Sequence, residues 1–263
     1  MTATLLHPNL LERYGKVPLP RYTSYPPANL WGERDQTLAL EALSTVGSRP
    51  LSLYVHVPFC RKLCLYCGCN MLVTRSQDLV ERYLHALDVE VARVAACLPA
   101  RSEVVQVHLG GGTPTYLDEA QLSRLWQSLA SRFHIPRRIE ASIEIHPPVT
   151  SNAQMQRLAE LGFVRVSMGV QDFDPIVQKR VNRIQPFEQT RDLVLLARQL
   201  GFVSVNIDLM YGLPLQTVER FSMTLDRVAE LDQLFVAHLV HAHVGVDPGE
   251  CEQLLGTGTA DAV

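Results

Sequence analysis

The stretch Tyr54-Val-His-Val-Pro-Phe-Cys60-Arg-Lys-Leu-Cys64-Leu-Tyr-Cys67-Gly-Cys69-Asn70 follows a strand-like apolar run and places four cysteines within ten residues. Three thiolates in one short loop can ligate three irons of a cubane [4Fe–4S] cluster and leave the fourth iron open to a ligand. The C-x3-C-x2-C spacing therefore predicts such a cluster on Cys60, Cys64 and Cys67. We expect Cys69 beside the cluster, because it is too close to Cys67 to complete the cube easily.

Other uses of crowded thiols compete with this interpretation. A zinc knuckle normally needs a second pair of cysteines, and the chain has none, since Cys97 and Cys251 stand alone. Neighbouring cysteines this close rarely form disulfides with each other. Four buried but inert thiols within ten residues would be unusual. An iron–sulfur site is the favoured reading, and zinc and inert thiols stay as alternatives.

The chain around the cysteine loop alternates strand-like runs with amphipathic stretches, which is typical of βα units and a parallel sheet. Periodicity alone does not separate a doubly wound open sheet from a partial barrel. Strands are predicted at residues 51–57, 104–109, 140–145, 164–168, 204–210 and 235–240. Helices are predicted at residues 35–43, 76–97, 118–133, 152–161, 187–200 and 216–231. Gly162 and Gly201 follow two of these helices, where left-handed cap residues are expected.

Polar and glycine residues fall at the predicted carboxyl ends of the strands, where function gathers in both architectures. Gly110-Gly111-Gly112 follows the second strand, and successive glycines let a backbone approach a ligand closely, although a plain turn is the alternative. Glu144 ends an otherwise apolar strand, so it either reaches a pocket or lies in a locally solvated strand. Asp208 needs a partner, for which a ribose hydroxyl and Arg183 are both candidates.

Five residues also have simple structural interpretations. Composition alone would place Tyr54 in the core, and Arg183 follows other basic residues as a solvated helix end would. His238, His241 and His243 crowd the last strand, where ordinary strand histidines are favoured over a metal site.

Composition limits the partners. Hydrophobic residues make up 47% and charged residues 19% of the 263 residues, and the net charge is −3. Acids and bases are interspersed, so no nucleic-acid partner is expected. No apolar run approaches the roughly 18 residues of a membrane span, and residues 1–10 do not resemble a signal peptide. We expect a cytoplasmic monomer that contacts no membrane.

Several segments in order carry a family resemblance. The cysteine loop after a first strand resembles that of the radical S-adenosylmethionine (SAM) superfamily. The segments at residues 21–26 (RYTSYP), 109–116 (LGGGTPTY), 167–173 (SMGVQDF) and 206–214 (NIDLMYGLP) resemble the oxygen-independent coproporphyrinogen III oxidases, or coproporphyrinogen dehydrogenases. The resemblance implies an α/β fold, a radical SAM partial (β/α)6 barrel with an irregular N-terminal extension.

The resemblance also implies a site. It implies that the cluster binds SAM and that a second SAM shares the pocket. The residues it assigns to SAM are Tyr54, Tyr66, Gly111, Gly112, Thr113, Glu144, Gln171, Arg183, Asp208 and Ala242. Among these, the glycine turn would bind the methionyl amino group, Glu144 one SAM, and Gln171, Arg183 and Asp208 the second SAM. Family members usually carry an acid where this chain has His146.

The implied reaction is anaerobic oxidative decarboxylation of two propionates of coproporphyrinogen III to vinyl groups, giving protoporphyrinogen IX for haem biosynthesis. A 5′-deoxyadenosyl radical from SAM would remove a hydrogen from each propionate. A reduced donor such as flavodoxin or ferredoxin would supply electrons. The segment at residues 21–26 would lie near the substrate opening, where an Arg fork and hydroxyls suit carboxylates.

The resemblance fades toward the C-terminus. The expected divisions are an N-terminal extension at residues 1–48, a radical SAM core at 49–245 and a divergent, disordered tail at 246–263. The family's helical C-terminal domain is expected to be absent through truncation or a frame shift, with poor or no turnover. Two alternatives stay open: a radical SAM protein acting on another tetrapyrrole or transferring methyl groups, and a haem chaperone. Cys69 and the segment at residues 21–26 favour the oxidase.

Overall fold

A computed structural model describes residues 32, 36–231 and 237–241 of the chain, which divides into two compact units, Met1–Ala42 and Leu43–Val263. The described part of the first unit is Gly32 and the beginning of helix α2 (Gln36–Ser44). The segment at residues 21–26, Ala242, His243 and the tail lie outside the described residues. The domain boundaries therefore stay predictions.

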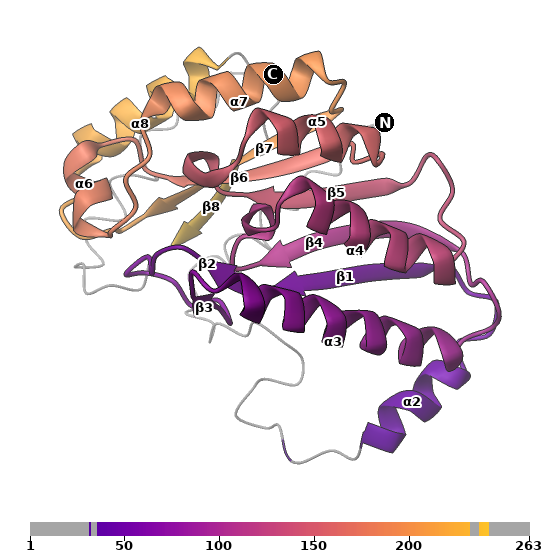
Figure 1. The fold of residues 1–263 in the computed structure, drawn as a ribbon. Helices are drawn as coiled ribbons and strands as arrows, with labels where there is room; N and C mark the ends of the chain where they lie inside the picture. Colours follow the sequence, from indigo (N-terminus) through magenta and orange to yellow (C-terminus); the bar gives the residue numbers. More distant parts are fainter. Residues whose placement is uncertain (1–31, 33–35, 232–236, 242–263) are drawn as a thin grey trace, which may run out of the picture. The chain divides into compact units, whose positions relative to one another are not determined.

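The second unit is built on one parallel sheet of six strands, drawn from indigo β1 to yellow β8 in Figure 1. The strands pair in the order β1-β4-β5-β6-β7-β8, so each large strand adds beside the previous one. They are β1 (Leu51–Val57), β4 (Val104–Gly111), β5 (Glu140–Ile145), β6 (Arg165–Gln171), β7 (Ser204–Tyr211) and β8 (Ala237–His241).

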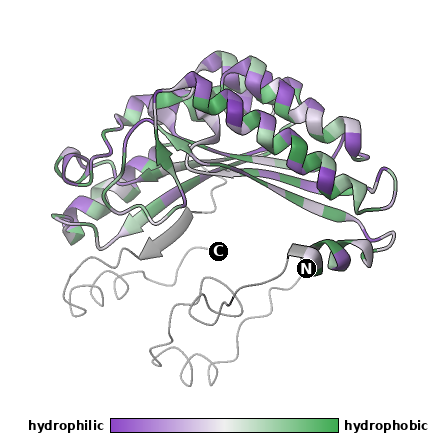
Figure 2. Cartoon of the chain, turned by 60° about the horizontal axis from the view of Figure 1, so that its bottom comes forward, coloured by the Kyte–Doolittle hydropathy of each residue, from purple (hydrophilic) through white to green (hydrophobic). Residues whose placement is uncertain are grey.

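This unbroken order decides between the two architectures that periodicity left open. A doubly wound sheet reverses its strand order and carries helices on both faces. Right-handed crossovers that always step in one direction place every helix on the same face. Figure 2 shows the curved sheet with its helices over the convex side, so the fold is the expected partial (β/α)6 barrel. The helices are α3 (Gln77–Ala96), α4 (Glu119–Arg132), α5 (Asn152–Glu160), α6 (Pro175–Arg180), α7 (Phe187–Gln199) and α8 (Val218–Glu230).

The two faces of the sheet differ in polarity because successive strand residues point to opposite sides. The residues toward the helices are apolar and almost fully buried, as at Val107, Leu109, Ile143, Met168 and Ile207. The alternate residues form what we call the concave face, and they are polar. They include Tyr54, His56, Gln106, His108, Ser142, Glu144, Ser167, Asn206 and Asp208.

Local sequence sets the helix boundaries. Asp118 and Ser151 each accept a hydrogen bond from the third residue of the helix they precede, and each forms a reciprocal capping box. Ser76 and Thr217 cap α3 and α8 in the same way with one side-chain bond each. Gly162 and Gly201 have positive φ angles of 92° and 84°, as expected for left-handed residues after helix ends.

The predicted elements agree with the structure to within three residues at each described end, and three kinds of short element were not predicted. Helix α6 has six residues, fewer than two turns, and follows β6. Two turns of 3-10 helix, η2 (Pro114–Tyr116) and η3 (Pro147–Val149), follow β4 and β5. A small parallel pair, β2 (Phe59–Cys60) and β3 (Leu72–Val73), encloses the cysteine loop.

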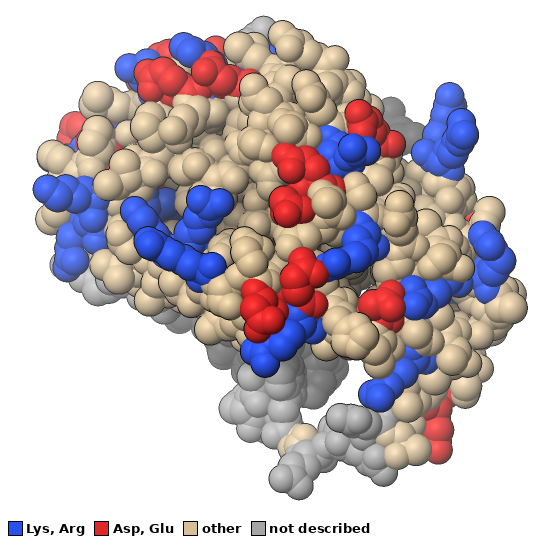
Figure 3. Space-filling model, viewed as in Figure 1, with Lys and Arg blue, Asp and Glu red and all other residues tan. Residues whose placement is uncertain are grey.

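Acidic and basic side chains are interspersed over most of the face seen in Figure 3, and several basic side chains gather at its left. None of the described helices is both long enough and apolar enough to span a bilayer.

Candidate functional site

The cysteine loop leaves the sheet at the end of β1 and is closed at its base by the β2–β3 pair. Leu72 N donates to Pro58 O at 2.7 Å, and Thr74 N donates to Cys60 O at 3.2 Å. Between these points a tight turn joins Cys64 O to Cys67 N at 3.0 Å. The backbone therefore fixes both ends of the loop and leaves its thiols at the carboxyl end of the sheet.

The tip of the loop is tied to a distant part of the chain. Leu65 N donates to Val181 O at 2.9 Å, and the Asn182 side chain donates to Leu63 O at 2.7 Å. Asn182 adopts a left-handed conformation with φ of 56° to make this turn. The contact fixes the loop against the segment that carries Arg183.

The thiols lie in different surroundings. Burial raises the pKa of Cys60, and a hydrogen bond between its sulfur and Thr113 Oγ1, at 3.4 Å, partly offsets that shift. Burial, followed by the neighbouring Cys67, raises the pKa of Cys69 to about 11. Cys64 Sγ accepts a hydrogen bond from Arg183 Nη1 at 3.5 Å. None of the described cysteines is in a disulfide.

The thiols of Cys60, Cys64, Cys67 and Cys69 line one cavity of about 420 Å³. Within the described ranges, no group of three or more His, Cys, Asp or Glu side chains is arranged to hold a single metal ion. A zinc ion would draw its ligands together at one centre. A cubane spreads its cysteines over separate irons, so this donor set fits a cluster better than one ion.

The same cavity collects the predicted ligand residues from five strand ends. All of them line it except Tyr54, which lies beside it, and Ala242, which is outside the described residues. The lining includes Cys60, Cys64, Cys67, Cys69, Tyr66, Gly111, Gly112, Thr113, Glu144, His146, Gly169, Gln171, Arg183 and Asp208.

The glycine turn after β4 is required by packing as well as by any ligand. Gly111 has φ of 121°, a conformation that L side chains rarely adopt. A Cβ on Gly112 would lie 2.8 Å from both the carbonyl carbon and the oxygen of Pro58. The turn therefore lies directly against the start of the cysteine loop, and this contact alone explains a glycine at Gly112.

Glu144 lines the cavity, so of the two expectations for this residue, a pocket or a locally solvated strand, the structure shows the pocket. Its Oε2 accepts from Gly111 N at 3.2 Å, and its Oε1 lies 3.3 Å from His108 Nε2. The side chain is 46% exposed, so it is accessible to a ligand.

Asp208 is held by neighbours that the sequence reasoning did not identify. Ser167 Oγ donates to its Oδ2 at 2.9 Å, and Asn206 Nδ2 donates to its Oδ1 at 2.7 Å. All three side chains are on the concave face of β6 and β7, where a period-two reading of the polar residues would have grouped them.

Arg183 is a half-buried cavity residue, so its reading as a solvated helix end is wrong. Its guanidinium donates to Cys64 Sγ and to the backbone oxygen of Gly169, while its buried Nε has no partner among the described residues. Gln171, beside it, is left-handed with φ of 72° at an irregularity in the β6–β7 pairing. A non-glycine residue held in this conformation is often associated with a functional site.

The two tyrosines differ. Tyr66 is packed among Val177, Val181, Met210 and Leu213, and burial raises its pKa far above the ordinary value. Tyr54 is 58% exposed, so its placement in the core by composition is wrong.

His146 was noted only as a departure from the family pattern. Burial, followed by the charge of Arg183, lowers its pKa to about 3, so the imidazole is neutral at physiological pH. Its Nε2 is buried without a partner among the described residues. An unpaired polar atom at a cavity wall is available to a bound molecule or to water.

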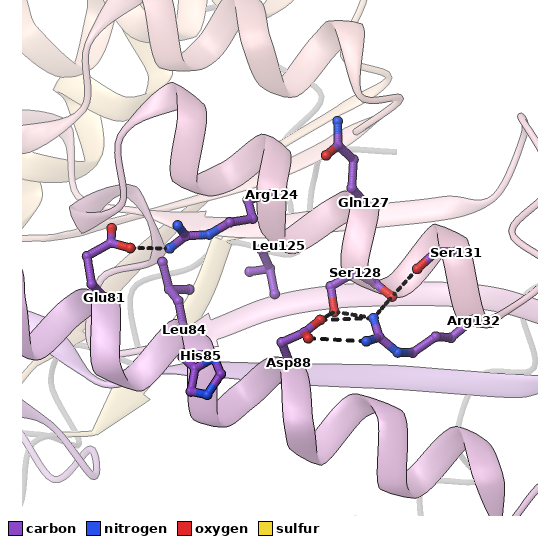
Figure 4. A pocket seen from close by; sticks show the side chains of 10 residues that line it. All are labelled: Glu81, Leu84, His85, Asp88, Arg124, Leu125, Gln127, Ser128, Ser131 and Arg132. Atoms are coloured by element: carbon purple, nitrogen blue, oxygen red, sulfur yellow. Dashed lines mark hydrogen bonds and ion pairs between the residues drawn. The ribbon is translucent and has the colours of Figure 1, made fainter.

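A larger hollow of about 610 Å³ lies between α3 and α4, away from the cysteine loop (Figure 4). Its charged side chains are paired with each other. Arg124 Nη2 lies 2.6 Å from Glu81 Oε2, and Arg132 Nη1 lies 2.9 Å from Asp88 Oδ1. These pairs join the two helices, and they leave this groove without the convergent free groups of a binding site.

Comparison with known proteins identifies close relatives. Residues 54–228 match the family model of the radical SAM superfamily. A protein of Salmonella typhimurium named oxygen-independent coproporphyrinogen III oxidase is 50% identical over 225 residues, which cover 84% of this chain and 49% of that protein. One of Pseudomonas aeruginosa with the same name is 44% identical over 241 residues, covering 89% and 52%. The chain thus spans about half the length of the curated relatives it matches.

Solved structures agree on the fold. The Escherichia coli coproporphyrinogen III oxidase, described as a radical SAM enzyme, superposes with a TM-score of 0.81 at 40% identity, covering 94% of this chain and 59% of that one. A structure of the protein anSMEcpe with bound AdoMet and a peptide has a TM-score of 0.54 at 16% identity, covering 79% and 58%. The second likeness concerns the fold alone.

Proposed function

Because the chain belongs to the radical SAM superfamily, we propose that its cavity binds a [4Fe–4S] cluster and SAM for the anaerobic oxidative decarboxylation of coproporphyrinogen III. The observation that carries the proposal is the meeting of the cysteine thiols, the glycine turn and Glu144 in one cavity. The names of the relatives supply the substrate.

Cys60, Cys64 and Cys67 would hold the cluster, with Cys69 beside it. When bound, the cluster together with SAM would supply a 5′-deoxyadenosyl radical, which can abstract hydrogen from an unactivated carbon. Thr113 hydrogen-bonds Cys60, and Arg183 donates to Cys64, so each of these sulfurs has a neighbour that can stabilise its negative charge.

One SAM would contact Tyr54, Glu144 and the turn at Gly111, Gly112 and Thr113. In this arrangement, Glu144 provides a carboxylate for the positively charged amino group or for hydroxyls. A second SAM would contact Tyr66, Gln171, Arg183, Asp208 and Ala242. The unpaired nitrogens of Arg183 and His146 give the cavity further groups that a ligand can satisfy.

The substrate carries four carboxylates, so it needs positive charge near the opening. Arg61 and Lys62 are exposed at the edge of the cavity and supply it. Flavodoxin or ferredoxin as electron donor, a monomeric state and a cytoplasmic location complete the proposal.

Anaerobic reconstitution tests it directly. The protein, refilled with iron and sulfide, should bind about four of each per chain and give a paramagnetic signal after dithionite. It should then cleave SAM to methionine and 5′-deoxyadenosine. Alanine at the three cluster cysteines should abolish all of these, whereas Cys97→Ala, at a half-buried cysteine after α3, is the matched control.

Loss of coproporphyrinogen III with formation of vinyl groups tests the substrate. SAM cleavage without consumption of this porphyrinogen would reject the substrate and retain the enzyme class. Haem binding with no SAM cleavage would reject the enzyme. An unchanged cluster signal in the cysteine variants would reject the site.

A further inference from the structure

His108 lies beside the proposed SAM carboxylate and has no assigned role. It is on the concave face of β4, and it pairs in register with Ser142 of β5. Its Nδ1 is 2.7 Å from Ser142 Oγ, and its Nε2 is 3.3 Å from Glu144 Oε1. The imidazole therefore connects two side chains of the next strand, one of which lines the cavity.

We propose that His108, oriented by Ser142 and Tyr54, is a positioning residue that fixes the Glu144 carboxylate for the ligand in the cavity. The inference rests on the proposed function, because it takes SAM as that ligand. His108 itself does not line the cavity, so it acts through Glu144.

The hydrogen-bond chemistry supports one direction for the contact with Glu144. A carboxylate only accepts, so His108 Nε2 must carry the proton. Ser142 Oγ can then donate to a bare Nδ1. In a charged imidazolium, Nδ1 donates to Ser142 Oγ, which lies 3.4 Å from Val107 O and can donate there. The Nε2 donor faces Glu144 in both arrangements of the Ser142 hydrogen bond.

The carboxylate is consequently held through both oxygens. His108 binds Oε1, and the backbone nitrogen of Gly111 binds Oε2. Since Gly111 also belongs to the proposed ligand turn, these two donors fix Glu144 relative to the turn. When a carboxylate is already fixed before binding, less side-chain conformational entropy is lost when the ligand binds, so binding is stronger.

The His108 imidazole is also oriented by Tyr54, which packs on the face of the ring. The Tyr54 ring stacks on it with centroids 5.8 Å apart and an interplanar angle of 19°. Tyr54 OH is 3.0 Å from His56 Nδ1, and His56 Nε2 is 2.7 Å from Asn70 O at the end of the cysteine loop. The series of contacts links the loop to Glu144 through His108.

The test compares three substitutions that separate the functions of the ring. Glutamine can place an amide near the Nε2 position, asparagine can place one near Nδ1, and phenylalanine keeps only the stacking surface. SAM dissociation constants are measured by equilibrium dialysis on the anaerobically reconstituted full chain, with iron content and melting temperature recorded for every variant.

His108→Gln should bind SAM within about threefold of wild type. His108→Asn and His108→Phe should bind about tenfold to a hundredfold more weakly at unchanged iron content, as is typical when a partner of a binding group is removed. Adding His108→Phe to Glu144→Gln should weaken binding little beyond Glu144→Gln alone, because His108 acts only through the Glu144 carboxylate.

Gln106→Ala is the matched control. Gln106 lies two residues earlier on the same face of β4 and donates to Glu140 of β5 at 3.1 Å, but it does not line the cavity. Its SAM affinity should equal that of wild type.

Wild-type affinity in His108→Phe, or equal losses in His108→Gln and His108→Phe, would overturn the inference while leaving the proposed function intact. Loss of affinity in Gln106→Ala equal to that in His108→Phe would also overturn it, since the effect would be general to the strand. A wild-type protein that carries the cluster and binds no SAM would overturn the proposed function and this inference together.

Discussion

Gly112 offers the sharpest test of how the glycine turn is packed. In Gly112→Ala, the new Cβ would lie 2.8 Å from Pro58 C and Pro58 O, and 3.0 Å from Phe59 O. Contacts below 3.0 Å essentially do not occur for real Cβ atoms, and all three neighbours are backbone atoms that cannot rotate away. The turn or the start of the cysteine loop must therefore shift.

The expected cost follows from the size of the overlap. Forcing one methyl group into a filled site typically destabilises a protein by about 1–3 kcal/mol. For a chain of this size, that corresponds to a fall in melting temperature of about 2–12 °C. Pro58 O also accepts the Leu72 amide that closes the base of the loop, so the shift should reach Cys60 and lower cluster content as well.

Gly68→Ala is the matched control, because Gly68 lies within the cysteine loop and a Cβ there has nothing within 4 Å. Thermal unfolding followed by circular dichroism, with iron and sulfide analysis, compares the two variants. Gly68→Ala should keep the wild-type melting temperature and cluster. If Gly112→Ala matched Gly68→Ala in both measurements, the packing argument for this turn would be refuted.

Three further outcomes are expected. Serine at any one of the three cluster cysteines should abolish the reduced-cluster signal in spectroscopy of the reconstituted protein, while Cys97→Ser should retain it; equal signals would contradict the assignment. Asp172→Asn should lower the free energy of unfolding by about 1–3 kcal/mol in urea, because an amide NH2 would face the Gln216 NH2 that now donates to Asp172, and a wild-type midpoint would contradict this. Burial raises the pKa of Asp172 above 3.8, so folding disfavours the charged form of this residue relative to the unfolded chain. The difference in the free energy of unfolding between wild type and Asp172→Asn should therefore shrink as pH rises through the shifted pKa. The pKa of His146 is about 3 in the folded chain, against an ordinary value of 6.5. Between pH 6.5 and pH 3 only the unfolded chain protonates this imidazole, so the free energy of unfolding falls as pH falls. His146→Gln should remove this loss, about 2 kcal/mol at pH 5, and identical pH slopes of unfolding for the two proteins would disprove it.

The strands and long helices could be predicted because their signals are local. The run Ile139-Glu-Ala-Ser-Ile-Glu-Ile145 alternates with a period of two, and capping residues such as Asp118 and Ser151 mark helix starts within one turn. Strand order is not local, so the choice between a doubly wound sheet and a partial barrel required the structure. Helix α6 and the two-residue strands β2 and β3 are too short to carry a periodic signal.

The residues of the candidate site also divide into those with a local sequence signal and those without one. The cysteine loop and the glycine turn are contiguous in sequence, and both were identified from it. His108, Ser142 and Asn206 were missed because each stands between apolar neighbours in its strand, and only the pairing of neighbouring strands brings such residues together. Tyr54 was misplaced because its apolar neighbours suggested a core position, although it points to the concave face.

The two hydrogen bonds between the tip of the cysteine loop and residues 181 and 182 have a consequence for the order of assembly. They join residues that are 116 and 119 positions apart in sequence, so whatever immobilises the loop also immobilises the residue that follows, Arg183. Insertion of the cluster should therefore precede and strengthen occupancy of the proposed second SAM position, which Arg183 would share with its hydrogen bond to Cys64 Sγ. Protein lacking iron would then bind at most one SAM, and maturation of the cluster would act as the step that admits the other.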